Sequence, residues 1–196
     1  MPRRRIPFRS NHFYHIYNRG INQDLIFFSP DNYHYFQRLL RRNIRRYNIA
    51  VVAYCLLPNH YHLLLRPRKD NNLSQFMNSL FGSYTQAVNK QQGRLGPLFQ
   101  GRFHAILVDK EEYLIHLARY IHLNPVISEL SNAAHEWPFS NYVDVVAHRG
   151  GDFKDTTLVP ERFSSGEEYQ KFVEDHSYDR SEIEGLERYL LEQDTH

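Results

Sequence analysis

The hydrophobic pattern of residues 1–124 switches repeatedly between a period of two and a period of three to four, and this alternation restricts the fold most. Apolar or alternating runs rich in β-branched and aromatic residues predict strands at 12–18, 49–57, 60–67 and 103–109. Helical spacing predicts helices over about 30–47, 73–91 and 110–124. The order β-α-β-β-α-β, followed by a helix, is the ferredoxin-like α+β arrangement, in which two helices cover one face of an antiparallel sheet.

Local signals set the element boundaries. Ser29 is expected to cap the first helix, with Pro30 at its first position. Pro58 and Asn59 predict a tight turn that makes a hairpin of the second and third strands. Pro125 is expected to end the third helix at Asn124, because the residue before a proline avoids the α region.

The charged residues divide the chain into a basic part and an acidic part. Residues 1–124 hold 18 Lys and Arg against 6 Asp and Glu, whereas residues 125–196 hold 6 against 16. A basic body suits a polyanionic partner. We predict a main domain over 1–142, with its core at about 12–126, and an acidic extension over 143–196 that is helical from about 161 to 194.

The cysteine content and the absence of long apolar runs bear on the cellular location of the protein. A single cysteine, Cys55, excludes an intramolecular disulfide and is expected to be a small buried side chain in a cytoplasmic protein. No apolar run approaches the roughly 18 residues that a membrane span needs, and no signal peptide is visible. We therefore expect no membrane partner.

His60 and His62 form the first candidate site. Strand side chains alternate, so both histidines are expected on one face, with Tyr61 on the other. Two imidazoles at this spacing can bind one metal ion, although the spacing alone is equally consistent with two surface or hydrogen-bonded histidines.

Tyr120 and Asn124 form the second candidate site. Residues four apart share a helix face, so the phenol of Tyr120 and the amide of Asn124 are expected to be neighbours. A tyrosine can act as a nucleophile if its phosphate target is polarised, and the amide oxygen can complete a metal site. Core packing remains the ordinary interpretation of a helical tyrosine.

A stripe of arginines forms the third candidate site. The first helix carries them at helical spacing, with no acidic residue between them. They are Arg38, Arg41, Arg42, Arg45 and Arg46. Phosphate contacts are the favoured interpretation, against a solvated face or pairing with the acidic extension. Further candidates for DNA contact are Arg3, Arg4, Arg5, Arg19 and Arg102.

Several segments together resemble the REP-associated tyrosine transposases, which belong to the HUH single-tyrosine transposases. The resemblance covers about residues 12–142. Its segments, in the family's order, are YHIYNRG (14–20), LPNHYHLLLRP (57–67), GPLFQGRF (96–103), RYIHLNPV (119–126) and EWPFSNY (136–142).

The resemblance implies roles for these residues. His60 and His62 match the HUH histidines, Tyr120 the nucleophile, and Asn124 the amide that completes a site for Mg²⁺ or Mn²⁺. The implied reaction cuts and rejoins single-stranded DNA that carries palindromic hairpins, through a 5′-phosphotyrosine and a free 3′-OH. Whether the enzyme is a monomer or a homodimer is left open.

Other functions compete with this one. A non-catalytic nucleic-acid-binding module shares the ferredoxin-like order, but the chain lacks the aromatic strand motif of RNA-recognition domains. A replication initiator shares the HUH chemistry, and a metal-dependent phosphodiesterase also uses histidines but leaves no covalent protein–DNA species. No phosphate-binding loop of the Walker type is present, so the reaction need not involve ATP.

Overall fold

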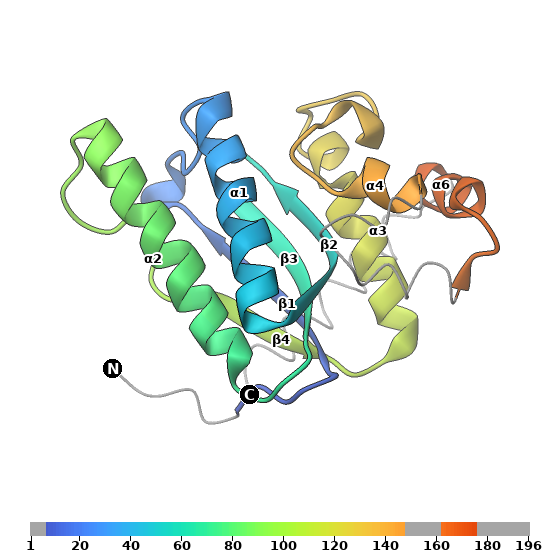
Figure 1. The fold of residues 1–196 in the computed structure, drawn as a ribbon. Coiled ribbons are helices and arrows are strands. Elements are labelled where there is room, and N and C mark those ends of the chain that lie inside the picture. Colours follow the sequence, from blue (N-terminus) through green and yellow to red (C-terminus); the bar gives the residue numbers. More distant parts are fainter. Residues whose placement is uncertain (1–6, 148–161, 176–196) are drawn as a thin grey trace.

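The computed structural model describes residues 7–147 and 162–175 (Figure 1). One antiparallel sheet forms its centre, with the strand order β2-β3-β1-β4. The strands are β1 (Phe13–Arg19), β2 (Ile49–Leu56), β3 (His60–Pro67) and β4 (His104–Val108). This is the strand order of the ferredoxin-like arrangement, so the predicted fold class is confirmed.

Helices α1 (Pro30–Tyr47) and α2 (Asn72–Gln92) pack side by side on one face of the sheet (Figure 1). Their apolar stripes and the facing strand residues form the larger core, which includes Phe36, Leu80 and Tyr84. As predicted, α1 begins at Pro30 after Ser29 in an extended conformation. It ends at Asn48, whose left-handed backbone turns the chain into β2.

Helix α3 (Glu111–Ile127) covers the opposite face of the sheet (Figure 1). Leu114, Leu117 and Ile121 of this helix pack on Val52 and Leu64 of the sheet. The sheet is therefore buried on both faces, which explains why β2 reads as a continuous apolar run instead of an alternating one.

Pro125 does not end α3, which corrects the boundary predicted from the sequence. The helix continues to Ile127, with Pro125 inside it. Pro125 has no N–H to donate to the carbonyl of Ile121, but the Ser128 N–H donates to the Asn124 carbonyl at 2.9 Å. One lost hydrogen bond is thus tolerated in the last turn, and Asn124 lies within the helix instead of at its end.

The segment after α3 closes the outer edge of β2. The Leu56 N–H donates to the Phe139 carbonyl at 2.9 Å, and Cys55 and Ser140 form an isolated bridge. The remaining short elements are η1 (Ile21–Gln23), η2 (Ala134–Glu136), α4 (Tyr142–Val146) and α6 (Gly166–Glu174). Helices α4 and α6 pack beside α3 in a third, smaller core (Figure 1).

The acidic extension is described only in part. Helix α6 lies within the stretch predicted to be helical, and its Phe172 is packed as expected. The other apolar positions of that stretch lie outside the described residues; they are Ile183, Leu186, Tyr189 and Leu190. The division at residue 142 and the cytoplasmic location stay predictions. Cys55 is buried and unpaired, as predicted, and no helix in 7–147 or 162–175 is long and apolar enough to cross a membrane.

Candidate active site

The hairpin turn before β3 fixes the position of His60. The N–H of Leu57 donates to the His60 carbonyl at 2.9 Å and closes the turn. The backbone carbonyls of the two turn residues also accept hydrogen bonds. The Asn59 carbonyl accepts from the N–H of Gly20 at 2.8 Å, and the Pro58 carbonyl accepts from the N–H of Ile26 at 2.8 Å. A side chain at position 20 would collide with the Asp24 carbonyl, so this close approach requires glycine.

Alternation along β3 places the two histidines as predicted. Tyr61 is buried in the core under α1 and α2, whereas His60 and His62 lie on the face that α3 covers. The rings of His60 and His62 are perpendicular, with centroids 5.2 Å apart. The two side chains therefore lie close enough to bind one ion.

Two asparagines hold the His60 ring. Its Nδ1 lies 2.7 Å from Oδ1 of Asn59, and its Nε2 lies 3.4 Å from Oδ1 of Asn124. Burial lowers the pKa of His60, opposed by the contact with Asn124, so the imidazole is neutral near pH 7. If Nδ1 donates to Asn59, the lone pair of Nε2 points at an amide oxygen that can only accept.

His62 is oriented by a third histidine that the sequence did not single out. Its Nδ1 lies 3.0 Å from Nε2 of His15 on β1. Burial, followed by the proximity of His15 and His60, holds the pKa of His62 well below its usual value, and burial lowers the pKa of His15 to about 3. Both rings are therefore neutral, and a His62 that donates through Nδ1 presents the lone pair of Nε2.

Helix α3 brings Tyr120 and Asn124 to this histidine pair. The Tyr120 ring meets the His62 ring edge-on, with centroids 5.7 Å apart. Tyr120 is half-buried, and Asn124 is buried one turn further along the same face of the helix. The structure thus gathers His60, His62, Tyr120 and Asn124, which lie up to 64 residues apart in the sequence.

The donor set fits a divalent cation. If His60 donates through Nδ1 to Asn59, its Nε2 and the Oδ1 of Asn124 face each other as two lone-pair donors, an arrangement that a cation beside them would stabilise. Two neutral imidazoles and an amide oxygen are acceptable ligands for Mn²⁺ and, less readily, for Mg²⁺. Among residues 7–147 and 162–175, no group of three His, Cys, Asp or Glu side chains offers a competing site.

A buried polar network fixes α3 against β2. Asn141 accepts from the Tyr54 N–H at 2.7 Å and donates to the Val52 carbonyl at 3.2 Å. Its Oδ1 also lies 3.1 Å from Nε2 of His122, whose Nδ1 lies 2.8 Å from the hydroxyl of Tyr169. His122 lies on α3, the helix that carries Tyr120, so Asn141 links the position of that helix to the edge of the sheet.

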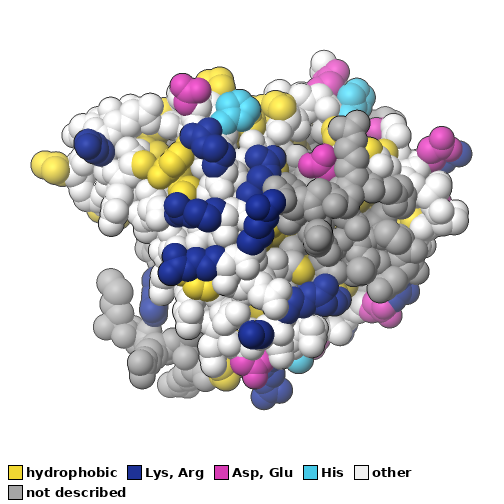
Figure 2. Space-filling view, in the orientation of Figure 1, with side chains coloured by type: hydrophobic (Ala, Val, Ile, Leu, Met, Phe, Trp, Pro, Cys, Tyr) yellow, Lys and Arg dark blue, Asp and Glu magenta, His cyan; other side chains and the backbone are white. Residues whose placement is uncertain are grey.

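The arginine stripe lies on the other side of the sheet from the histidines. All five arginines of α1 are exposed or half-exposed, and Figure 2 shows Lys and Arg side chains in columns over this helix. Arg19 is exposed at the end of β1, where its Nε donates to Oε1 of Gln100 at 2.6 Å. The remaining candidates, Arg3, Arg4 and Arg5, lie outside the described residues.

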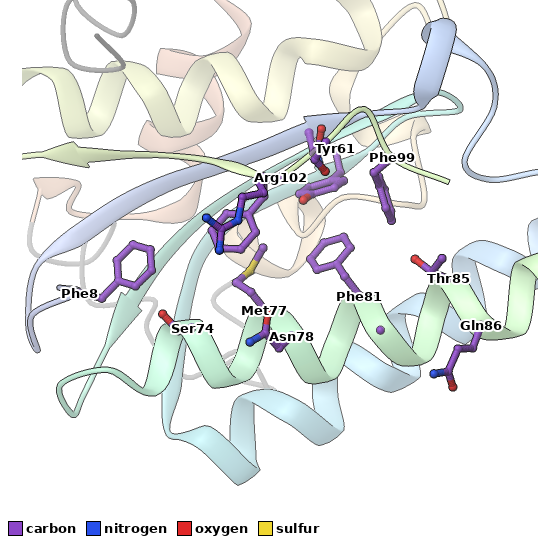
Figure 3. Close-up of a pocket in the computed structure, with 14 residues that line it drawn as sticks. Phe8, Tyr61, Ser74, Met77, Asn78, Phe81, Thr85, Gln86, Phe99 and Arg102 are labelled. Atoms are coloured by element: carbon purple, nitrogen blue, oxygen red, sulfur yellow. The ribbon is translucent and has the colours of Figure 1, made fainter. Parts of the chain in front are cut away.

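Arg102 lines a pocket on the same side of the sheet as the arginine stripe. The pocket has a volume of about 610 Å³ and lies between α2 and the segment 99–103. Figure 3 shows Met77 and Phe81 pointing into it from α2, with Phe99 and Arg102 across from them. The sheet separates this pocket from His60 and His62, so it does not belong to the histidine site.

Comparison with known proteins identifies the family. The family model described as "Transposase IS200 like" matches residues 8–124. The Haemophilus influenzae protein named "Putative REP-associated tyrosine transposase" is 27% identical over 117 residues, which are 55% of this chain and 66% of that protein. The chain thus spans a little less than two thirds of that relative.

A solved structure supports the fold. It is that of a REP-associated tyrosine transposase bound to a REP hairpin, with a TM-score of 0.63, 21% identity, and coverage of 76% of this chain and 87% of that one. At this identity the likeness concerns the fold. The resemblance to REP-associated tyrosine transposases that the sequence motifs predicted is confirmed by the family model and by the Haemophilus influenzae relative. Because the family model matches more than half of the sequence, including the histidine pair and Tyr120, the chain belongs to the IS200-like transposase family.

Proposed function

We propose that the protein cuts and rejoins single-stranded DNA by transesterification, with Tyr120 as the nucleophile. The observation that carries the proposal is the convergence of His60, His62 and Asn124 beside the Tyr120 ring on one face of the sheet. A phenol, two neutral imidazoles and an amide that converge at one point form a set that suits phosphoryl transfer.

The reaction balances without ATP. The Tyr120 oxygen bonds to phosphorus and loses its proton to solvent, while the bond from phosphorus to the 3′ oxygen breaks and that oxygen takes up a proton. A phenol has a pKa near 10, so it needs help to react at neutral pH. A divalent ion held by His60, His62 and Asn124 would polarise the phosphate and offset its developing charge. Attack by another 3′-OH on the phosphotyrosine reverses the step and rejoins the strands.

The DNA partner is proposed to be a palindromic hairpin with a single-stranded flank. The exposed arginines of α1 form a surface for the phosphates of the stem, and the structural neighbour was solved with a REP hairpin. The arginine stripe and Tyr120 lie on opposite faces of the sheet. A DNA that contacts both therefore has to pass around an edge or an end of the sheet.

A denaturing gel tests the proposal. Labelled hairpin DNA from palindromic repeats of the source genome is incubated with protein and Mn²⁺, because imidazole ligands bind Mn²⁺ more tightly than Mg²⁺. We expect a covalent band that protease removes, that EDTA abolishes and that the variant Tyr120→Phe lacks. Phenylalanine keeps the edge-on contact with His62, so that variant should fold.

Tyr113→Phe is the matched control, because Tyr113 is a half-buried tyrosine two turns earlier on the same helix. It should form the covalent band at the wild-type level. Hairpin binding without any covalent band, in Mn²⁺ and with several repeat hairpins, would instead favour the non-catalytic binding module. Release of a cut strand without attached protein would favour a phosphodiesterase.

A further inference from the structure

A row of flat rings crosses the sheet from the histidine pair to the edge strand β4. Tyr17 on β1 lies opposite His62 on β3 and opposite His104 on β4. The rings of Tyr17 and His104 stack with centroids 4.8 Å apart and planes 13° apart. Tyr17 is also parallel to His62, at 6.0 Å and 21°. The three rings therefore form one stack that begins beside Tyr120.

The outer end of this stack is open to solvent. His104 is exposed, Tyr17 is half-buried and His62 is only 8% exposed, so exposure rises along the row toward the edge. β4 is the last strand in the order of the sheet. The opposite edge, along β2, is closed by Phe139 and Ser140.

A cation accompanies the stack on the same face. Residues of β1 alternate, so the side chain of Arg19 leaves the same face as Tyr17. Arg19 is exposed and lies opposite His60 in the register of β1 and β3. A strand of DNA along the row would thus meet a guanidinium for its phosphates and stacked rings for its bases.

We propose that the exposed ring of His104, backed by the stacked ring of Tyr17, is a stacking site for an unpaired base near the scissile phosphate. Proteins that bind single strands combine a cationic track with aromatic rings on which bases stack, and each such stack is worth about 1–3 kcal/mol. Packing between neighbouring strands accounts for the half-buried ring of Tyr17. It does not require an aromatic residue at the exposed position of His104. The inference deepens the proposed function and rests on it.

The dimensions agree with a neighbouring nucleotide. Adjacent strands lie about 4.8 Å apart, so His104, two strands away from β3, lies about 10 Å from the position of His62. A short run of extended nucleotides covers that span. With the scissile phosphate at His60 and His62, a base one or two nucleotides away reaches the outer face of His104, and the DNA leaves the site across the β4 edge.

Fluorescence of 2-aminopurine tests the stack, because stacking quenches this base. Hairpin oligonucleotides carry it at one flank position at a time, and binding is measured in EDTA with the Tyr120→Phe protein, so that no cleavage intervenes. We expect quenching at one or two flank positions. His104→Ala should abolish that quenching and weaken binding about tenfold, the loss of one stack (~1.4 kcal/mol).

His104→Phe and His135→Ala are the controls. Phenylalanine keeps a flat ring without the imidazole nitrogens, so it should restore both quenching and affinity. His135 is an exposed histidine beside α6, away from the row, and its replacement should change neither. Replacing the stacked base by an abasic site should weaken wild-type binding but leave the His104→Ala variant unaffected.

The outcomes separate this inference from the proposed function. If the wild type forms the covalent band but His104→Ala retains the quenching and the affinity, the stacking site is wrong and the tyrosine chemistry stands. Rescue by His104→Phe supports stacking, whereas failure of that rescue with a folded variant would overturn it. If no hairpin oligonucleotide binds and no covalent band forms, the proposed function fails and the stacking site with it.

Discussion

Asn141 is expected to hold helix α3 in place, and its replacement should lower the stability of the fold. The side chain is 2% exposed and serves three partners: the Tyr54 N–H, the Val52 carbonyl and His122. Asn141→Ala leaves these buried groups unsatisfied. Each unsatisfied group costs about 1–3 kcal/mol, and partial relaxation reduces their sum. We therefore expect the free energy of unfolding to fall by about 3 kcal/mol.

The assay is urea unfolding followed by far-ultraviolet circular dichroism, paired with the rate of covalent-complex formation on hairpin DNA. Asn132→Ala is the matched control, because Asn132 is exposed and only its backbone N–H binds Glu136. Its effect should stay within about 0.5 kcal/mol. Asn141→Asp keeps the acceptor for Tyr54 but loses the donor to Val52, so it should fall between the two.

The reasoning also predicts a catalytic effect beyond stability. If Asn141 positions α3, the Asn141→Asp variant should cleave more slowly at saturating DNA under conditions where it is fully folded, while its affinity for the hairpin stem stays unchanged. An Asn141→Ala variant whose unfolding free energy lies within about 1 kcal/mol of the wild type would refute the energetic argument. A folded variant with the wild-type cleavage rate would refute the positioning role.

Two further predictions concern the proposed metal site and the arginine stripe. His15→Leu removes the hydrogen bond to His62 and should weaken Mn²⁺ binding about 10- to 100-fold in calorimetric titration. His15→Gln can still accept a hydrogen bond from His62 and should weaken the binding less. Wild-type affinity in His15→Leu would show that His62 does not need this hydrogen bond to bind the ion. Alanine at Arg41, Arg42 and Arg45 of α1 should weaken hairpin binding. The slope of log affinity against log salt concentration should fall in magnitude by about 2–3, because each lost phosphate contact removes about 0.9. An unchanged slope would show that the stripe does not contact the DNA.

The elements of the fold could be predicted because each has a strong local cause. The spacing of apolar residues gave α1 and α2 to within a residue or two of their observed ends, and the turn at Pro58 placed β3. Pro125 misled the prediction for α3, because a proline in the last helical turn forfeits one hydrogen bond while the bond from Ser128 to Asn124 continues the helix. The face that α3 covers has no local signal, since it depends on the packing of the whole sheet.

The candidate site could be predicted only where its residues are neighbours in the sequence. His60 and His62 share a strand face, and Tyr120 and Asn124 share a helix face, so each pair could be proposed from spacing. His15 meets His62 only through the pairing of β1 with β3, 47 residues away, and nothing near position 15 indicates it. Their roles as ligands and nucleophile stay predictions until the experiments above are done.

The two edges of the sheet limit how DNA can reach both candidate surfaces. The arginine stripe on α1 and the phenol of Tyr120 are separated by the thickness of the sheet, and the edge at β2 is occupied by Phe139, Ser140 and the buried Asn141. A strand that passed there would have to displace hydrogen bonds that also hold α3. The edge at β4 carries the exposed ring of His104. A DNA strand that leaves a stem on α1 for the histidine pair would therefore pass the β4 edge or an end of the sheet, and the position of the quenched base relative to the stem would measure the length of that route.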